Sequence, residues 1–316
     1  MSVLCNELRK SGITPVGYVP VKSDVLGILQ RLRSTDFDAV VVNGEGSIHD
    51  TYGNLYAASL CQVATFANAY LKKPCYLINA SVHNVANRHI ENLRDFTRIW
   101  VRETQSRAVL EQYGICANVV PDLSFFHEDG ASETMHDPRY FVTDSVSGIR
   151  SRQLERLAVA WNVPVWPLKV NNEKTLRRRV FCRLRSYKPQ RRIRFRLSSI
   201  KKTEQHLVKV CEAMRVANVT VTGRFHAATL AISRQRPVLA VESNTPKIGA
   251  LLHDVFASEE RKVNDIDELL HEPPEVCSER VAYTGWESER IRAYKDDGRR
   301  AMTKMFADLA EDATST

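Results

Sequence analysis

Short β-branched runs and longer runs with helical spacing alternate along this chain, and the stretch 219–242 shows the pattern most clearly. Residues 219–222 read Val-Thr-Val-Thr, which is typical of a strand buried on both faces. Gly223 interrupts that strand, residues 227–232 are mostly good helix formers, and a second apolar run follows at 238–241. This order predicts strand, helix and strand, which is half of a parallel α/β unit.

The same alternation extends over the rest of the chain. We predict strands over 38–43, 75–79, 99–102, 118–122, 140–143 and 163–167. We predict helices over 3–9, 25–33, 56–71, 88–96, 154–161, 248–255, 265–270 and 286–310, and one that ends at Tyr113. The polar stretch 128–138 is expected to link two α/β domains, which cover 1–130 and 139–316. Because an α/β domain normally opens on a strand, we expect the first strand of the N-terminal domain to be missing or supplied differently.

The composition fits a globular protein with sizeable cores, since 43% of the 316 residues are hydrophobic. The seven cysteines are scattered and form no Cys-x-x-Cys pair, which argues against a disulfide framework and a zinc site and favours a reducing compartment. No signal-peptide pattern opens the sequence, and the longest mainly apolar stretch, 56–71, is too short to span a bilayer. We therefore expect a cytoplasmic protein.

The net charge of +8 is concentrated in one segment, 174–202, which holds thirteen basic residues and no acid. Taking those thirteen charges from +8 leaves −5 for everything else. A solvated insertion loop is one interpretation of this segment. Nucleic acid is a less favoured partner, because only Phe181, Tyr187 and Phe195 could stack on bases. Apolar residues spread among the cations favour an anionic membrane surface, so we expect peripheral attachment at the inner face of the cell membrane.

Arg224 and His226 are the first candidates for chemistry, because they stand where the strand 219–222 turns into a helix. The free backbone N–H groups and the helix dipole favour an anion at such a position. A guanidinium beside a titratable imidazole suits a phosphate or carboxylate that also needs a proton moved. A surface arginine with a histidine that caps its own helix is the simpler interpretation of this pair.

Further polar residues follow the strands predicted in the first half. We expect the strand 38–43 to be a central strand. It runs into a glycine turn, Gly44-Glu45-Gly46-Ser47, which would let the backbone approach a ligand closely. This is not the dinucleotide fingerprint, because His49 stands where its third glycine belongs. Arg102, with Ser106 just beyond it, and Asp122 also fall at strand ends. Because ligands of open parallel sheets bind beyond the carboxyl ends of the strands, these residues are expected to share one rim.

Taken in order, these motifs resemble the polysaccharide pyruvyl transferase family. The match consists of Asn43-Gly44-Glu45-Gly46, Val101-Arg102-Glu103 with Ser106, Pro121-Asp122, Gly223-Arg224-Phe225-His226-Ala227 and Lys247-Ile248. The resemblance implies two Rossmann-like domains that face each other across a cleft, with the acceptor bound on the N-terminal side and the donor on the C-terminal side. This is the GT-B architecture of many glycosyltransferases. It also implies transfer of a pyruvyl group from phosphoenolpyruvate onto sugar hydroxyls of a surface polysaccharide or its lipid-linked precursor, as a ketal.

Carried over to this chain, Arg224 and His226 match the donor-binding Arg-x-His of the family, and Arg102 matches the arginine of its Val-Arg-Glu or Val-Arg-Asp motif. The sequence departs from the family in three places. The usual glycine-rich opening strand and loop do not precede Ser2, the acidic-Lys motif reads Ser-Asn-Thr-Pro-Lys at 243–247, and the basic segment is not a family feature.

The chemistry of phosphoenolpyruvate asks for similar residues. Its phosphate and carboxylate need two guanidinium groups, which Arg102 and Arg224 could supply. His226 is the candidate acid for the methylene carbon, and Glu45 or Asp122 is the candidate base for the sugar hydroxyl. The predicted donor site also includes Gly223, Ser106 and Lys247, and we expect neither a metal nor a cofactor.

Two other functions remain open at this point. A glycosyltransferase of the same fold would bind a nucleotide sugar, with its diphosphate at the Arg-x-His helix. A non-catalytic binding module would keep the glycine stretch and lack a working acid. Which donor raises the melting temperature distinguishes the first two functions.

Overall fold

The computed structural model describes residues 2–19, 27, 29, 36–51, 56–127, 140–168 and 208–314. Of the predicted helix over 25–33, only residues 27 and 29 are described, and both are helical. The predicted linker, the two domain boundaries at 130 and 139, and the basic segment 174–202 lie outside the described residues.

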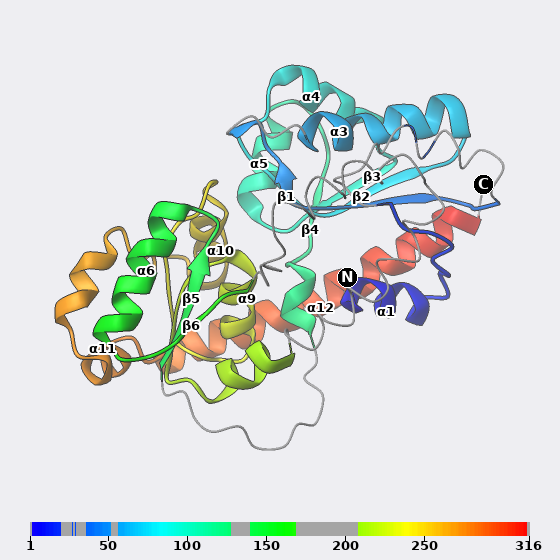
Figure 1. Cartoon of the computed structure of the whole chain (residues 1–316). Helices are drawn as coiled ribbons and strands as arrows, with labels where there is room; N and C mark the ends of the chain where they lie inside the picture. Colours follow the sequence, from blue (N-terminus) through cyan, green and yellow to red (C-terminus); the bar gives the residue numbers. More distant parts are fainter. Residues whose placement is uncertain are drawn as a thin grey trace, which may run out of the picture.

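The first half of the chain forms a parallel sheet in the order β1-β2-β3-β4. Its strands are β1 (Val40–Ile48), β2 (Cys75–Val82), β3 (Arg98–Val101) and β4 (Asn118–Val119). Its helices are α1 (Ser2–Lys10), α3 (Tyr56–Phe66) with the π-helical turn η3 (Ala67–Leu71), α4 (Asn87–Glu91) with the 3-10 turn η4 (Asn92–Asp95), and α5 (Thr104–Glu111). A 3-10 turn, η5 (Leu123–Phe126), follows β4. Figure 1 shows α3, α4 and α5 on one side of this sheet and α1 on the other.

The second half forms another parallel sheet, in the order β6-β5-β7-β8. Its strands are β5 (Tyr140–Ser145), β6 (Val165–Trp166), β7 (Val219–Gly223) and β8 (Val238–Ala240). Its helices are α6 (Gly148–Ala160), a helix over 208–216, α9 (Phe225–Ser233), α10 (Lys247–Phe256), the 3-10 helix η7 (Ile266–His271), α11 (Pro274–Arg280) and α12 (Gly285–Thr314). The prediction of an α/β fold with parallel strands is therefore confirmed.

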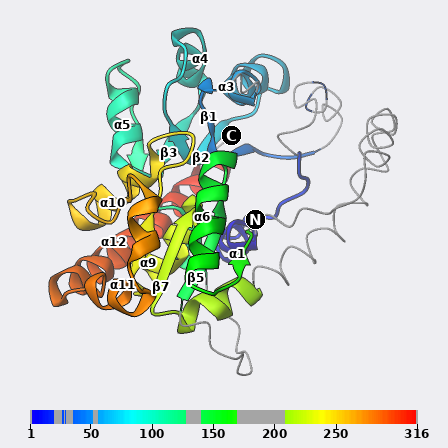
Figure 2. The same ribbon diagram turned by 60° about the vertical axis from the view of Figure 1, so that its left-hand side comes forward.

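The last helix, α12, returns from the second sheet to the first (Figures 1 and 2). Arg98 of β3 forms ion pairs with Asp308 and Asp312 near its end, at 3.0 and 2.9 Å. Met302 and Phe306 of the same helix are buried in a core cluster that also contains residues of α1, β2 and α9. The two halves of the chain thus share apolar contacts as well as ion pairs. Among the described helices, none combines the length and the apolar composition needed to cross a membrane.

The glycine turn predicted after 38–43 is wrong, because β1 continues through Gly44, Glu45, Gly46 and Ser47 to Ile48. The strand stays paired with β2 across an irregularity between Glu45 and Ile48. A Cβ on Gly44 would lie 2.7 Å from the Cβ of Ala80, so glycine is what permits this close pairing. In the described part of the sheet, β1 is also an edge strand and not the central strand that its apolar run suggests.

Candidate active site

Arg102 connects the first sheet to helix α9. It follows β3, and only 2% of its surface is exposed. Its Nη1 donates to Oδ2 of Asp122 at 2.7 Å, and its Nε donates to the hydroxyl of Ser81 at 2.6 Å. Its guanidinium lies over the ring of Phe225, the first residue of α9, 3.8 Å from the ring centroid. The predicted site arginine of the first half is therefore held rigidly against the second half.

Arg224 is held in a similar way within the second sheet. It is the N-cap residue of α9, and its Nε donates to Oδ1 of Asp144 at 2.9 Å while its Nη2 donates to Oδ2. Asp144 lies near the end of β5, which pairs with β7. Each arginine is thus fixed by an aspartate. Asp122 lies just beyond β4, the strand next to β3, and Asp144 lies in β5, the strand next to β7. Sequence reasoning missed Asp144 as a site residue, although its position at a strand end was the available signal.

His226 lies beside the carboxylate that holds Arg102. Its Nε2 is 3.7 Å from Oδ2 of Asp122, and its side chain is 46% exposed. Burial alone would raise the pKa of Asp122, but the charges of His226 and Arg102 and the hydrogen bonds from Ser124 lower that pKa to about 2. A carboxylate with so low a pKa is a weak base, so the structure argues against Asp122 as the base for a sugar hydroxyl. Its position makes it the partner of Arg102 and His226.

Lys247 brings a third cation to the site from the start of α10. It is 7% exposed, and its Nζ donates to Oδ1 of Asn244 at 3.3 Å. Burial and the nearby charge of Arg102 lower the pKa of Lys247 to about 8. A Cβ built on Gly46 would lie 3.0 Å from Nζ of Lys247 and 3.2 Å from Nη2 of Arg102. Gly46 of β1 therefore leaves room for cations from both halves of the chain.

The N-termini of α9 and α10 differ in a way that bears on ligand binding. Glu242 caps α10, because its two carboxylate oxygens accept from the backbone N–H groups of Ile248 and Gly249 at 3.2 and 2.9 Å. The side chain of Arg224 makes no such capping hydrogen bond at α9. The positive end of α9 is thus the one that can attract an anion.

Glu45 lies next to Gly46 in β1, with a backbone φ of +45°. This conformation costs a residue with a side chain about 1 kcal/mol, and such strain is common at functional sites. Its Oε1 accepts a hydrogen bond from Nδ2 of Asn43 at 3.2 Å. The side chain is partly exposed, so the carboxylate is held in place without being enclosed.

Ser106 and Gly223, two of the predicted donor-binding residues, have structural roles in the described residues. Ser106 is fully buried; its hydroxyl accepts from the N–H of Val82 at 2.8 Å and donates to Glu103 at 2.9 Å. A Cβ on Gly223 would lie 2.4 Å from the Cβ of Ser145, so this glycine permits β7 to pack against β5. The structure gives neither residue a surface for a ligand.

His49 is a residue near the site that sequence reasoning noted only as a missing glycine. It follows β1, is 7% exposed, and its Nε2 lies 3.5 Å from Nδ2 of Asn244 in the second half. Burial and the charge of Lys247 lower its pKa. Its position directly beyond the glycine-containing strand was the signal that could have identified it.

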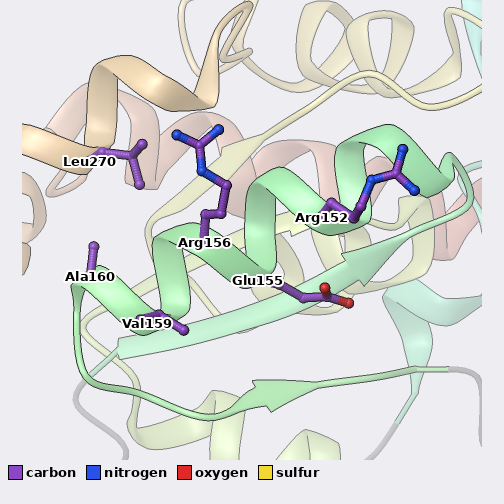
Figure 3. Close-up of a pocket in the computed structure, with 6 residues that line it drawn as sticks. All are labelled: Arg152, Glu155, Arg156, Val159, Ala160 and Leu270. Carbon is purple, nitrogen blue, oxygen red and sulfur yellow. The ribbon is translucent and has the colours of Figure 1, made fainter.

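Within the described ranges, no group of three or more His, Cys, Asp or Glu side chains is arranged to hold a metal ion. A shallow surface pocket beside α6 (Figure 3) contains none of the predicted site residues; it is lined by Arg152, Glu155, Arg156, Val159, Ala160 and Leu270.

A comparison with protein families identifies the family of this chain. A family model described as polysaccharide pyruvyl transferase matches residues 3–245. The chain belongs to the polysaccharide pyruvyl transferase family. In this member of the pyruvyl transferase family, the matched range includes Arg102, Asp122, Arg224 and His226, and Lys247 lies just beyond it. A comparison with curated proteins gives no match.

Several solved structures are distantly similar to this pyruvyl transferase family member. An α,α-trehalose-phosphate synthase (UDP-forming) from Burkholderia vietnamiensis has a TM-score of 0.48 at 12% identity, over 99% of this chain and 82% of that one. A functionally uncharacterised protein from Klebsiella pneumoniae has a TM-score of 0.47 at 11% identity, over 83% and 88%. A TarM mutant from S. aureus, in complex with fondaparinux, α-GlcNAc-glycerol and UDP, has a TM-score of 0.43 at 11% identity, over 80% and 53%. At TM-scores below 0.5, these likenesses assign no function to this chain.

Proposed function

We propose that this protein transfers the pyruvyl group of phosphoenolpyruvate onto sugar hydroxyls of a polysaccharide or its lipid-linked precursor, forming a ketal. The observation that carries this proposal is the meeting of Arg102 and Lys247 beside Gly46, with Arg224 and His226 at the uncapped start of α9. Phosphoenolpyruvate carries a phosphate and a carboxylate on one small molecule. Several fixed cations and a helix N-terminus are well suited to hold both groups at once.

Asp122 and Asp144 orient the two arginines for anion binding. Nη1 of Arg102 donates to Asp122, and this ion pair fixes the plane of the guanidinium. Nη2 of Arg102 has no hydrogen-bond partner among the described residues. Asp144 fixes the plane of Arg224 through Nε and Nη2, and Nη1 of Arg224 has no hydrogen-bond partner within the described ranges. Such preorganised donors bind an anion without reordering long side chains.

The transfer itself requires an acid and a base. In the proposed reaction, His226 gives a proton to the methylene carbon of phosphoenolpyruvate, and a sugar hydroxyl oxygen bonds to the adjacent carbon. Glu45 takes the proton that this hydroxyl loses. Inorganic phosphate then leaves with its C–O electron pair, and a second hydroxyl of the same sugar bonds to that carbon. The proton that this hydroxyl loses goes to the departing phosphate, which completes the ketal. Asp122, ionised above about pH 2, faces the imidazole throughout.

The first test is donor recognition by the purified protein. We expect phosphoenolpyruvate to raise the melting temperature, since a ligand at a hundred times its Kd stabilises a protein by about 2.7 kcal/mol. We expect no such rise with a nucleotide sugar. Stabilisation by the nucleotide sugar and none by phosphoenolpyruvate would refute the proposal in favour of a glycosyltransferase, and stabilisation by neither would refute donor binding.

Turnover is then measured as phosphate release in the presence of a glycan acceptor. Glu45→Gln should lower the rate by roughly a hundredfold, the lower end of the range for a general base, with little change in the melting temperature. The matched control is Glu260→Gln, because Glu260 is an exposed glutamate outside the cluster. Equal rates for the two variants would remove Glu45 from the reaction.

We also propose that the basic segment 174–202 holds the protein at the cytoplasmic face of an anionic membrane, where lipid-linked acceptors are assembled. The support is its sequence, with thirteen cations among apolar residues and no acid. Each cation near such a surface contributes about 1 kcal/mol. Flotation with anionic and neutral vesicles, with the full chain and a 174–202 deletion, tests this. Equal flotation of the two proteins would refute it.

A further inference from the structure

A line of side-chain amides leads from the loop after β4 to Glu45. The backbone N–H of Leu123 donates to Oδ1 of Asn79 at 3.3 Å. Nδ2 of Asn79 donates to Oδ1 of Asn43 at 3.1 Å, and Nδ2 of Asn43 donates to Oε1 of Glu45 at 3.2 Å. Three consecutive hydrogen bonds thus join the residue after Asp122 to the carboxylate in the bulged part of β1.

The chemistry of the two ends fixes the direction of every hydrogen bond between them. A backbone N–H can only donate, so the atom of Asn79 that faces Leu123 must be its carbonyl oxygen. The other end of Asn79 is then its NH₂ group, which must face the carbonyl oxygen of Asn43. The NH₂ group of Asn43 is left for Glu45, and an ionised carboxylate accepts it. The line therefore presents an N–H donor to Oε1 of Glu45, which accepts it and is held in one orientation.

The loop after β4 also fixes the donor side of the site. Asp122 accepts from Arg102 and lies near His226, while Leu123, the next residue, begins the line to Glu45. Asn79 is 6% exposed and has a φ of +53°, a left-handed conformation that asparagine adopts more readily than most residues. The requirement for an amide in that conformation explains why asparagine suits this buried position.

We propose that Asn43 and Asn79 are positioning residues that hold the Glu45 side chain correctly oriented toward the acceptor. The inference rests on the proposed function, in which Glu45 takes the proton of the sugar hydroxyl. The loop after β4 would then set the positions of both Arg102, through Asp122, and Glu45, through Leu123 and the two asparagines. Neither asparagine touches the substrates in this proposal.

The experiment compares wild-type protein, Asn43→Ala, Asn43→Asp and Asn79→Ala, with Asn118→Ala as a control because Asn118 is exposed on β4. Loss of the hydrogen bond from Asn43 should lower kcat about tenfold and leave the KM for phosphoenolpyruvate unchanged. The acidic limb of the pH–kcat profile should move to higher pH in Asn43→Ala and further in Asn43→Asp, because a lost hydrogen bond and an added like charge both raise the pKa of a carboxyl.

A double-mutant comparison decides whether the effect passes through Glu45. With Glu45→Gln already present, Asn43→Ala should cause no further loss of kcat. A full additional tenfold loss, or an unmoved acidic limb, would overturn the inference while wild-type transfer remained intact. If Asn79→Ala does not fold, the partly exposed Asn43 still provides both readouts. Absence of transfer by the wild-type protein would instead overturn the proposed function, so the two failures are distinguishable.

Discussion

Replacing Asp122 by asparagine removes the charge that holds Arg102 and faces His226. The two residues have nearly the same shape, so the substitution changes charge and hydrogen bonding with little change in volume. An asparagine oxygen can still accept from the N–H of Ser124, as Oδ1 of Asp122 does at 2.9 Å. Its NH₂ group would then face Nη1 of Arg102. Two donors would meet there, whereas in the wild-type protein Nη1 donates to Oδ2 of Asp122 at 2.7 Å.

The magnitude follows from the protonation of the wild-type residue. The pKa of Asp122 is lowered to about 2 from its ordinary 3.8. Since one pH unit of that difference corresponds to about 1.4 kcal/mol, the ionised carboxylate contributes about 2 kcal/mol to the free energy of unfolding. Leaving the buried charge of Arg102 without its partner adds to this loss, because breaking a buried ion pair costs about 3–5 kcal/mol. We expect Asp122→Asn to lower the free energy of unfolding by about 3–5 kcal/mol.

Urea unfolding at pH 7, followed by circular dichroism, measures this loss. The control is Asp297→Asn, because Asp297 pairs with Arg300 on the exposed face of α12 and should contribute less than about 1 kcal/mol. In wild-type protein the contribution of Asp122 is fully present above about pH 3.8 and is lost as the pH falls through about 2, because its folded pKa is the lower one. If Asp122→Asn unfolds at the same urea concentration as Asp297→Asn, the reasoning about this buried cluster is refuted.

The remaining predictions concern other groups of the site. The affinity for phosphoenolpyruvate should fall as the pH rises through about 8, where Lys247 loses its charge. In Lys247→Arg, the affinity should not change with pH in this range, because the guanidinium stays charged. Calorimetry at pH 6.5 and 9 checks both expectations. Gly46→Ala should weaken donor binding by displacing the cations, whereas Gly44→Ala should lower the free energy of unfolding by about 1–3 kcal/mol by separating β1 from β2; the reverse pattern would contradict the assigned roles. Arg224→Lys and His226→Ala should abolish transfer with the fold intact, and near-normal turnover of either variant would remove that residue from the active site.

Much of this fold could be predicted from local sequence alone. Buried parallel strands need apolar, β-branched runs, and the runs at 75–79, 140–143 and 219–222 lie within β2, β5 and β7. The rule that ligands bind at the carboxyl ends of such strands also identified Arg102 and Arg224. These features depend on neighbouring residues in the chain, which is why sequence reasoning reached them.

The functions of individual side chains at those ends depended on their partners. Ser106 follows a strand-end arginine as the pattern suggests, yet its hydroxyl lies inside, between Val82 and Glu103. Asp122 is also at a strand end, but burial beside Arg102 and His226 makes it a fixed anion and a weak base. Sequence spacing gives the position of a side chain along the chain, whereas its pKa depends on charges and burial contributed from elsewhere.

The alternation of strands and helices and the arginines at the strand ends can be inferred from the amino-acid sequence, because these features follow from periodicity and local turn chemistry. Long-range packing decided that the glycines belong to a bulged strand and that α12 returns to the first sheet. It also decided that Lys247 of α10 meets Arg102 beside Gly46. These contacts join residues that lie far apart in the chain. They depend on backbones and charges that come close together only when both sheets have formed.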